Sequence, residues 1–376
     1  MNTTILIAPN SFKECASSVE TARLIFKALK KYKPELNLIV KPISDGGDGF
    51  LEVCRYYFGG DIIKYKITTP YDDSLFECPV LYNSCRKKIF IESADVLGIK
   101  ILPQQFRKPM QLSSKGMGEL LLQINEGVNK EKIMVDDIVI GIGGTGTIDL
   151  GLGMCSQLGL SLIDVEGNAL DPMPNNYREI HNIQIDKIHF QFSIECVVDV
   201  NNPLIGTKGA AHSFGSQKGA SKDEIQEIDN SFSKVINILK NNILVDSSIR
   251  LSGAGGGLAA AFQFMFNSPL ISSQDFILSH LGLSRYIGES DYILTGEGVF
   301  DIQTFMGKGA YILVRRALAN NKEVFLVCGR YLVEEKFNEN VKVFELQELF
   351  KSKEESIKKF YEGIDKVCEK IALSVK

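Results

Sequence analysis

Short apolar runs that alternate with segments of helical period are the feature that most constrains the fold of this chain. The run 5–7 precedes a segment with apolar residues at helical spacing, and the runs 138–142 and 324–328 are further examples. Repeated strand–helix units predict an α/β fold with a largely parallel sheet. The alternation stops over residues 60–105, where several β-like runs follow one another, and it resumes later. We therefore expect a second domain inserted into the first.

The chain length of 376 residues is also more than one typical domain requires. We place the boundaries where the alternation breaks and resumes. Residues 1–60, 110–160 and 285–376 are expected to form one discontinuous domain, and residues 61–109 and 161–284 the inserted domain.

Charge and composition argue against two classes of partner. The formal net charge is −4, whereas a nucleic-acid binder usually has a basic excess. No apolar run approaches the ~20 residues of a membrane-spanning helix, so we expect neither a nucleic-acid nor a membrane partner. The N-terminus lacks the pattern of a signal peptide. The eight cysteines form no CxxC motif, and we interpret them as reduced thiols of a cytoplasmic protein.

Two glycine-rich segments point to a phosphate site. Residues 141–153 hold six glycines directly after an expected strand, and residues 253–257 hold four before an expected helix. Glycine lets backbone approach a ligand closely, and successive N–H groups can then face one anion. The alternative is that these glycines only form tight turns between packed strands and helices. There is no G-x-x-x-x-G-K-[ST] motif, which argues against a Walker-type NTPase.

Acidic residues stand beside glycine or asparagine at three expected strand ends: Asp45, Asp199, and the pair Glu297 and Asp301. In open α/β sheets ligands bind beyond the carboxyl ends of strands. Carboxylates there can hold Mg²⁺ or accept a proton from a hydroxyl. Ordinary turn chemistry explains any one of these segments equally well, so only their combination favours a site.

Two lysines complete this set. Lys13 follows the first expected strand, and Lys308 lies at the entry to a later helix. A lysine beside a glycine-rich loop is a reasonable phosphate partner, although a solvated surface lysine is the commoner explanation for either alone.

Taken in order, the segments APNSFKE, SDGGDG, GIGGTGTIDLGLGM, VVDVNNPLIGTKGAAHSFGSQKGA, GAGGGLAAA and ILTGEGVFDIQT resemble the bacterial glycerate kinase family, the type-1 or glycerate 2-kinases. The resemblance spans essentially the whole chain. It implies two α/β domains, one Rossmann-like and discontinuous, the other inserted with a mixed sheet, and an active site between them. It also implies phosphorylation of glycerate by ATP and a divalent metal, Mg²⁺, to 2-phosphoglycerate.

The resemblance and the motifs described above together let us assign roles to residues. Asp199 is expected to be the base that accepts the hydroxyl proton, with Lys13, Asp45 and Asp301 as further catalytic residues. Asp45 and Glu297 are the candidate Mg²⁺ ligands. The residues expected to hold ATP are Gly143, Gly144, Thr145, Gly253, Gly255, Gly256 and Lys308. Those expected to hold the substrate are Asn10, Ser11, Asn202 and Glu297.

Several positions depart from the family pattern. Asn10 and Asn201 stand where the family has Asp, Val299 where it usually has Arg, and residues 147–150 read TIDL instead of TNDG. Two other functions stay open at this point. The chain could be a weakly active or silent relative that binds a nucleotide or sugar acid, or a nicotinamide-dependent oxidoreductase built on the strand–glycine–helix units. If the chain associates with itself, we expect a homodimer.

Overall fold

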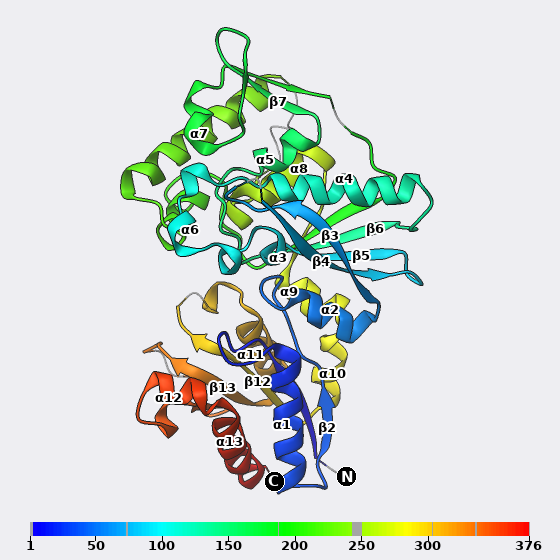
Figure 1. Cartoon of the computed structure of the whole chain (residues 1–376). Coiled ribbons are helices and arrows are strands. Elements are labelled where there is room, and N and C mark those ends of the chain that lie inside the picture. The colour runs from blue at the N-terminus through cyan, green and yellow to red at the C-terminus, as the bar shows by residue number, and fades with distance from the viewer. Residues whose placement is uncertain are drawn as a thin grey trace. The chain divides into compact units, whose positions relative to one another are not determined.

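The chain divides into two compact units, each built around its own sheet (Figure 1). The computed structural model describes residues 3–72, 74–186, 188–242, 250–302, 304–334 and 337–375. Gln303, which belongs to one of the motifs above, lies outside these described residues. We call residues 1–45 and 272–376 the split unit, and residues 46–271 the inserted unit.

The split unit contains a five-stranded sheet in the order β14-β13-β12-β1-β2, and every pair in it is parallel. Along the chain, this is the order 2-1-3-4-5 of a doubly wound sheet, whose ligand site lies where the order reverses, between β1 and β12. The strands are β1 (Thr4–Pro9), β2 (Asn37–Val40), β12 (Tyr292–Phe300), β13 (Glu323–Tyr331) and β14 (Val341–Glu345).

Helices cover both faces of this sheet. Helices α1 (Ser18–Tyr32) and α13 (Phe360–Ser374) lie side by side, blue and red in Figure 1, and share one apolar cluster with alternate strand residues. The intervening strand residues, such as Leu6, are also fully buried. Helices α10 and α11 pack against β1, β12 and β13. The remaining α-helices of this unit are α9 (Ser273–Asp275), α10 (Leu283–Glu289), α11 (Gly309–Ala319) and α12 (Lys353–Lys358).

The inserted unit has a six-stranded mixed sheet in the order β11-β10-β6-β5-β4-β3. Strands β10, β6 and β5 are parallel, whereas β5, β4 and β3 are antiparallel. A second, three-stranded sheet has the order β8-β7-β9. The strands are β3 (Asp61–Thr68), β4 (Leu75–Asn83), β5 (Lys88–Glu92), β6 (Asp137–Ile142), β7 (Leu160–Ile163), β8 (Ala169–Leu170), β9 (Asn182–Ile185), β10 (Ser193–Val198) and β11 (Leu270–Ser272).

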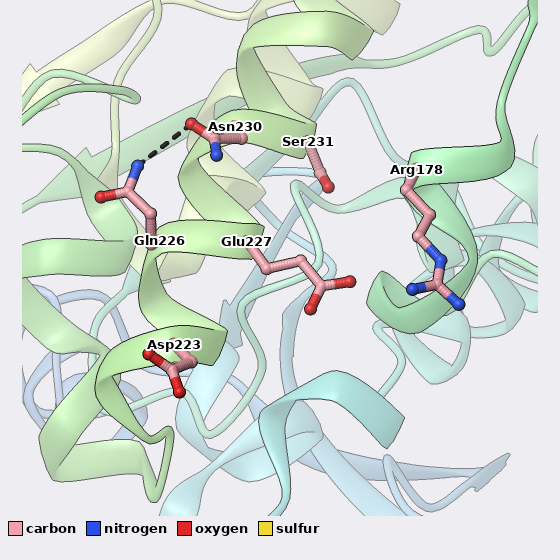
Figure 2. A pocket seen from close by; sticks show the side chains of 6 residues that line it. All are labelled: Arg178, Asp223, Gln226, Glu227, Asn230 and Ser231. Atoms are coloured by element: carbon pink, nitrogen blue, oxygen red, sulfur yellow. Dashed lines mark hydrogen bonds between the residues drawn. The ribbon is translucent and has the colours of Figure 1, made fainter.

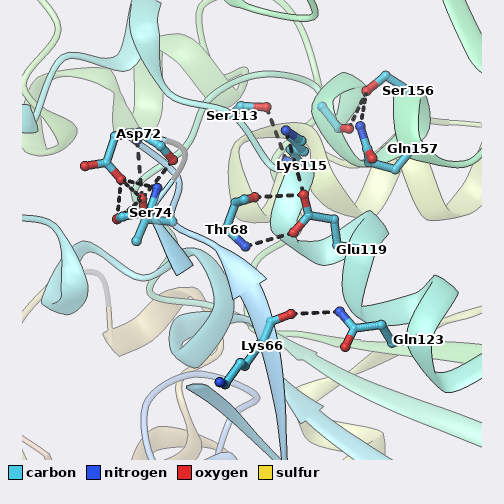
Figure 3. Close-up of polar contacts among 12 residues, drawn as sticks. Lys66, Thr68, Asp72, Ser74, Ser113, Lys115, Glu119, Gln123, Ser156 and Gln157 are labelled. Carbon is cyan, nitrogen blue, oxygen red and sulfur yellow. Dashed lines mark hydrogen bonds and ion pairs between the residues drawn. The ribbon is translucent and has the colours of Figure 1, made fainter. Parts of the chain in front are cut away.

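Side chains of α4 cover the edge strand β3 (Figure 3). Glu119 accepts hydrogen bonds from the backbone N–H of Thr68 at 2.8 Å and from its hydroxyl at 3.0 Å, and Gln123 donates to the carbonyl of Lys66 at 2.8 Å. Binding these groups protects an edge that could otherwise pair with another chain. The α-helices of the unit are α2 (Phe50–Phe58), α3 (Ser93–Leu97), α4 (Lys115–Asn129), α5 (Leu152–Gln157), α6 (Ala210–Lys218), α7 (Lys222–Asn241) and α8 (Leu258–Phe266).

The expected fold class is confirmed: two α/β units, one of them discontinuous with a doubly wound parallel sheet, the other inserted with a mixed sheet. The boundaries differ from the expected ones. Residues 46–60 and 110–160 belong to the inserted unit, and residues 272–284 to the split unit. The reason is strand pairing: β6 lies between β5 and β10 in the mixed sheet, although its sequence resembles a strand of a doubly wound domain. No described helix is long and apolar enough to cross a membrane.

A buried carboxylate organises the loop between β6 and α5. The side chain of Asp149 is fully buried. It accepts hydrogen bonds from the backbone N–H and hydroxyl of Ser114 at 2.7 and 2.6 Å, and from the N–H groups of Gly151 and Gly153 at 3.2 and 3.3 Å. Burial raises the pKa of Asp149, and these hydrogen bonds oppose the shift. Asp149 thus joins the starts of α4 and α5.

We predict that Asp149→Ala lowers the free energy of unfolding by about 3 kcal/mol or more, because it leaves several buried donors without an acceptor. Urea unfolding followed by circular dichroism measures this change. Asp171→Ala, at an exposed position of the same unit, is the matched control and should change stability by less than about 0.5 kcal/mol. Equal stability of the two variants would contradict the role given to Asp149.

Candidate active site

In the split unit, predicted site residues gather around the reversal point of the sheet. Asn10 directly follows β1, Asp45 follows the segment after β2, and Glu297 lies within β12. The buried amide of Asn10 donates to Oδ2 of Asp45 at 3.0 Å, while its Oδ1 accepts from the N–H of Ser11 at 2.8 Å. An aspartate at position 10 would instead bring two carboxylates together here. The asparagine therefore orients Asp45 without adding charge.

Glu297 is the most unusual carboxylate of this group. The residue is 6% exposed, and its Oε1 is buried without a hydrogen-bond partner in the described structure. Burial raises the pKa of Glu297 to about 8, and the positive charge of Lys308, whose Nζ lies 4.0 Å from Oε2, opposes the shift. A buried polar atom without a partner is costly, so this oxygen is a natural place for a cation or a donor group of a ligand.

Lys308 and Asp301 extend this group. The Nζ of Lys308 lies 3.6 Å from Oδ1 of Asp301, and the same Oδ1 accepts from the N–H of Thr304 at 3.2 Å. Lys308 also precedes α11 as its N-terminal cap residue. The structure thus brings Asn10, Asp45, Glu297, Asp301 and Lys308 together.

Two further predicted residues of the split unit are less buried. Ser11 is half-buried, and the side chain of Lys13 is exposed. The backbone of Lys13 nevertheless passes close to β12, because a Cβ placed on Gly298 would lie 3.3 Å from its backbone nitrogen.

In the inserted unit, the two glycine-rich segments lie against each other. The N–H of Leu150 donates to the carbonyl of Gly256 at 3.2 Å, and a Cβ on Gly256 would lie 2.2 Å from the carbonyl oxygen of Thr147. Gly255 and Gly256 have φ values of 66° and 71°, which other residues rarely adopt. Close packing therefore explains the glycines at 255 and 256, as the alternative interpretation expected.

The loop after β6, residues 143–149, has groups suited to an anion. Gly144 is exposed and has a φ of 67°. Within the described residues, no hydrogen bond uses the backbone N–H groups of Gly144 and Thr145. Gly143, in contrast, exchanges hydrogen bonds of 3.1 Å with the Ser93 hydroxyl. Adjacent unused N–H groups near a positive φ form the kind of concavity that binds phosphate.

Residues 141–146 also have the spacing G-x-G-x-x-G that occurs in dinucleotide-binding loops. That motif requires a helix that opens at the glycines. Here α5 begins only at Leu152, so the structural context of a nicotinamide site is missing from this loop.

The loop after β10 lies at the same end of the mixed sheet as the loop after β6, because the two strands are parallel neighbours. Asp199 is half-buried directly after β10. The side chain of Asn202 donates to the carbonyl of Lys208 and to the Ser213 hydroxyl, both at 2.9 Å. The carbonyl of Asn202 accepts from the N–H of Gly253 at 2.8 Å, so this loop is tied to the 253–257 segment.

Sequence reasoning missed two lysines of this unit. The Nζ of Lys218 donates to the hydroxyl of Thr145 at 3.1 Å and to the carbonyl of Thr147 at 2.8 Å. Lys100 lies 3.5 Å from Asp48 and 3.0 Å from the buried Glu92. The QKGA motif contained Lys218, but nothing in its spacing showed that the side chain turns inward; Lys100 lay in no motif.

A pocket on the surface of the inserted unit is lined by other residues than those predicted for the active site (Figure 2). Helix α7 and the 3₁₀ segment Pro174–Glu179 line it. None of the predicted site residues takes part. Its lining residues are Arg178, Asp223, Gln226, Glu227, Asn230 and Ser231.

In the described parts of the chain, no three His, Cys, Asp or Glu side chains come close enough together to hold a metal ion by themselves. Mg²⁺, however, is usually bound by one or two carboxylates together with water and substrate phosphates. Asp45 and Glu297 are compatible with a site of that kind.

A doubly wound sheet with carboxylates at its reversal point is typical of α/β proteins that bind a ligand beyond the carboxyl ends of their strands. The comparisons with known proteins define the class further. The model of the glycerate kinase family matches residues 5–376. The chain therefore belongs to the glycerate kinase family and is a kinase.

Individual relatives agree. The glycerate kinase of Halalkalibacterium halodurans is 31% identical over 331 residues, which cover 87% of this chain and 85% of that protein. The glycerate 2-kinase of Escherichia coli K12 is 32% identical over 330 residues, covering 86% and 84%. A crystal structure assigned as glycerate kinase 2 from Salmonella typhimurium LT2 has a TM-score of 0.77 and 26% identity, and the match covers 100% of this chain and 98% of that one.

The buried lysine yields a prediction on pH. Burial lowers the pKa of Lys218 from 10.5 to about 7, and the charge of Asp149 opposes the shift. Between these two values the unfolded chain holds one proton more than the folded chain, so folding becomes more favourable as pH rises. Relative to Lys218→Met, the wild-type protein should gain stability with a slope of up to about 1.4 kcal/mol per pH unit between pH 8 and 10.

Urea unfolding of both proteins at several pH values measures the difference in their free energies of unfolding. The protonation of groups that both proteins share cancels in this difference. A constant difference across this range would show that the Lys218 ammonium is not destabilised by burial.

Proposed function

We propose that the protein transfers the terminal phosphoryl group of ATP to the 2-hydroxyl of glycerate and forms 2-phosphoglycerate. The observation that carries this proposal is the similarity to the glycerate kinase and glycerate 2-kinase relatives over more than four fifths of each chain. The retained carboxylates at the reversal point of the split unit support it. Homodimer formation and a cytoplasmic location remain predictions.

In the proposed mechanism, positioning and charge neutralisation provide most of the catalysis. Asp199 accepts the proton of the attacking hydroxyl. Lys13 and Lys308 neutralise charge on the phosphates, and Asp301 orients Lys308, from which it lies 3.6 Å away. Asn10, Ser11 and Asn202 orient the substrate, with Glu297 in addition where it is not occupied by metal.

The phosphates of ATP are proposed to lie against the 143–145 loop. The N–H groups of Gly144 and Thr145, which no hydrogen bond of the described residues uses, would donate to phosphate oxygens. Gly253, Gly255 and Gly256 are proposed to contribute indirectly, because Gly256 packs the neighbouring segment against the carbonyl of Thr147 in this loop.

Mg²⁺ is proposed at Asp45 and Glu297. The unpartnered buried Oε1 of Glu297 is the feature that fits a cation. When bound, Mg²⁺ neutralises charge on the phosphate oxygens. The hydrogen bond from Asn10 fixes the orientation of Asp45 for such a role.

Purified protein tests the reaction directly. With MgATP and glycerate, release of ADP coupled to NADH oxidation should show turnover near the typical ~10 s⁻¹ of enzymes. Related hydroxy acids of three and four carbons form the comparison set. If none of them supports ADP release while calorimetry still detects ATP binding, the protein is a silent relative and this proposal fails.

We predict that Asp199→Asn lowers kcat by about 10²- to 10⁴-fold, because the amide cannot accept the hydroxyl proton. The KM for MgATP should stay nearly constant, since the substitution preserves shape. Asp186→Asn, at an exposed position of the same unit, is the control. Unchanged kcat in the Asp199 variant would remove it from the mechanism.

We also predict that Glu297→Gln raises the Mg²⁺ concentration for half-maximal activity by about tenfold or more, because a carboxylate ligand is lost. Stability at pH 6 should hardly change, since the pKa of about 8 keeps Glu297 protonated there. Glu323→Gln removes a surface carboxylate paired with Lys342 and serves as control. An unaltered Mg²⁺ requirement would exclude Glu297 as a metal ligand.

A further inference from the structure

Lys218 is the last residue of α6 and points into the inserted unit, where it is 5% exposed. Its Nζ donates two hydrogen bonds, to the hydroxyl of Thr145 at 3.1 Å and to the carbonyl of Thr147 at 2.8 Å. Both acceptors belong to the loop after β6. One buried side chain therefore fixes two points of this loop.

The carbonyl of Thr147 is also the place where the second glycine-rich segment makes its closest approach. Gly256 packs against this carbonyl so closely that a Cβ would lie 2.2 Å from its oxygen. Lys218 thus donates to the same carbonyl, that of Thr147, against which the 253–257 segment packs. A substitution of Lys218 is therefore expected to alter the conformation of both glycine-rich segments.

Burying an ammonium group is unfavourable unless it is compensated. Here the compensation consists of the two hydrogen bonds and the negative charge of Asp149, which favours the charged form of Lys218. An apolar side chain of similar length would avoid the cost of desolvation altogether. The presence of lysine at this position is therefore better explained by what it does to the loop than by stability.

We propose that Lys218 is a positioning residue of the kinase reaction, which holds residues 143–147 in the conformation that presents the Gly144 and Thr145 N–H groups to the ATP phosphates. The inference rests on the proposed nucleotide site. Lys218 acts through the loop, because its two hydrogen bonds are with Thr145 and Thr147; its Nζ also lies 6.0 Å from the centroid of the Phe214 ring.

The direct test is Lys218→Met, which keeps the length of the side chain and removes its donors. We expect the Kd for MgADP and the KM for MgATP to rise about tenfold or more, because the buried acceptors of Thr145 and Thr147 lose their donor and the loop loses its fixed conformation. The KM for glycerate should stay within about twofold, because the change is confined to the phosphate loop. Lys222→Met, at the exposed start of α7, is the matched control and should behave like the wild-type protein.

A merely structural lysine gives a different result. In that case Lys218→Met would change stability but leave nucleotide affinity within twofold of the control, and the proposal would be overturned. Lys218→Arg, which restores a charged donor, should recover part of the affinity if the hydrogen bonds matter. If Lys218→Met does not fold, as judged by circular dichroism, Lys218→Gln carries the same comparison.

The coupling of Lys218 to the loop is measured by a double-mutant cycle with Thr145→Val, which removes one acceptor while keeping volume. The two changes should be non-additive in their effect on MgADP affinity. Strict additivity would show that Lys218 does not act through Thr145. Because nucleotide binding is measured without glycerate, a negative result here is distinct from a failure of the wild-type protein to phosphorylate glycerate.

Discussion

The conformation of the loop 143–151 in the inserted unit depends on hydrogen bonds to two buried side chains, Asp149 and Lys218. Residues 143–151 leave β6 and run to the start of α5, with Asp149 fully buried at one end and Lys218 bound to the middle. Asp149 also ties the start of α4 to this point through Ser114. Two buried ionisable groups of opposite sign thus set the backbone path. The N–H groups of the exposed Gly144 and of the buried Thr145 have no acceptor among the described residues.

In the split unit, the order of the strands and a neutral amide position the candidate site residues. Its ligand-type groups come from strands that meet where the sheet order reverses, so topology alone brings Asn10 and Glu297 near each other. A neutral amide orients Asp45, and a partly buried lysine faces Glu297 and Asp301. Among the described residues, Oε1 of Glu297 is a buried carboxylate oxygen without a partner, whereas the buried Asp149 and Lys218 of the inserted unit have hydrogen-bond partners. That difference is why we assign the metal to the split unit and the backbone donors for the phosphates to the inserted unit.

Much of this organisation could be predicted from the sequence. Periodicity located several elements: the runs 5–7, 138–142 and 324–328 fall within β1, β6 and β13. The domain boundaries could not be predicted in the same way, because β6 is apolar and precedes glycines in either type of sheet, and only pairing with β5 and β10 assigns it. Motifs predict Asp45, Asp199 and Glu297 as site residues, and these assignments stay predictions. Motifs could not predict that the side chain of Lys218 turns inward, which depends on tertiary packing rather than on spacing.

The central claim is that the 143–147 loop, fixed by Lys218 and Asp149, receives the phosphates of the nucleotide. The most direct measurement is amide hydrogen exchange of the full chain with and without MgADP, resolved to Gly144 and Thr145. Neither amide has an acceptor within the described residues, and Gly144 is exposed whereas Thr145 is buried. We therefore predict fast exchange of the Gly144 amide in the free protein and strong protection of both amides with nucleotide. Saturating MgADP that leaves these two amides unprotected would contradict the account.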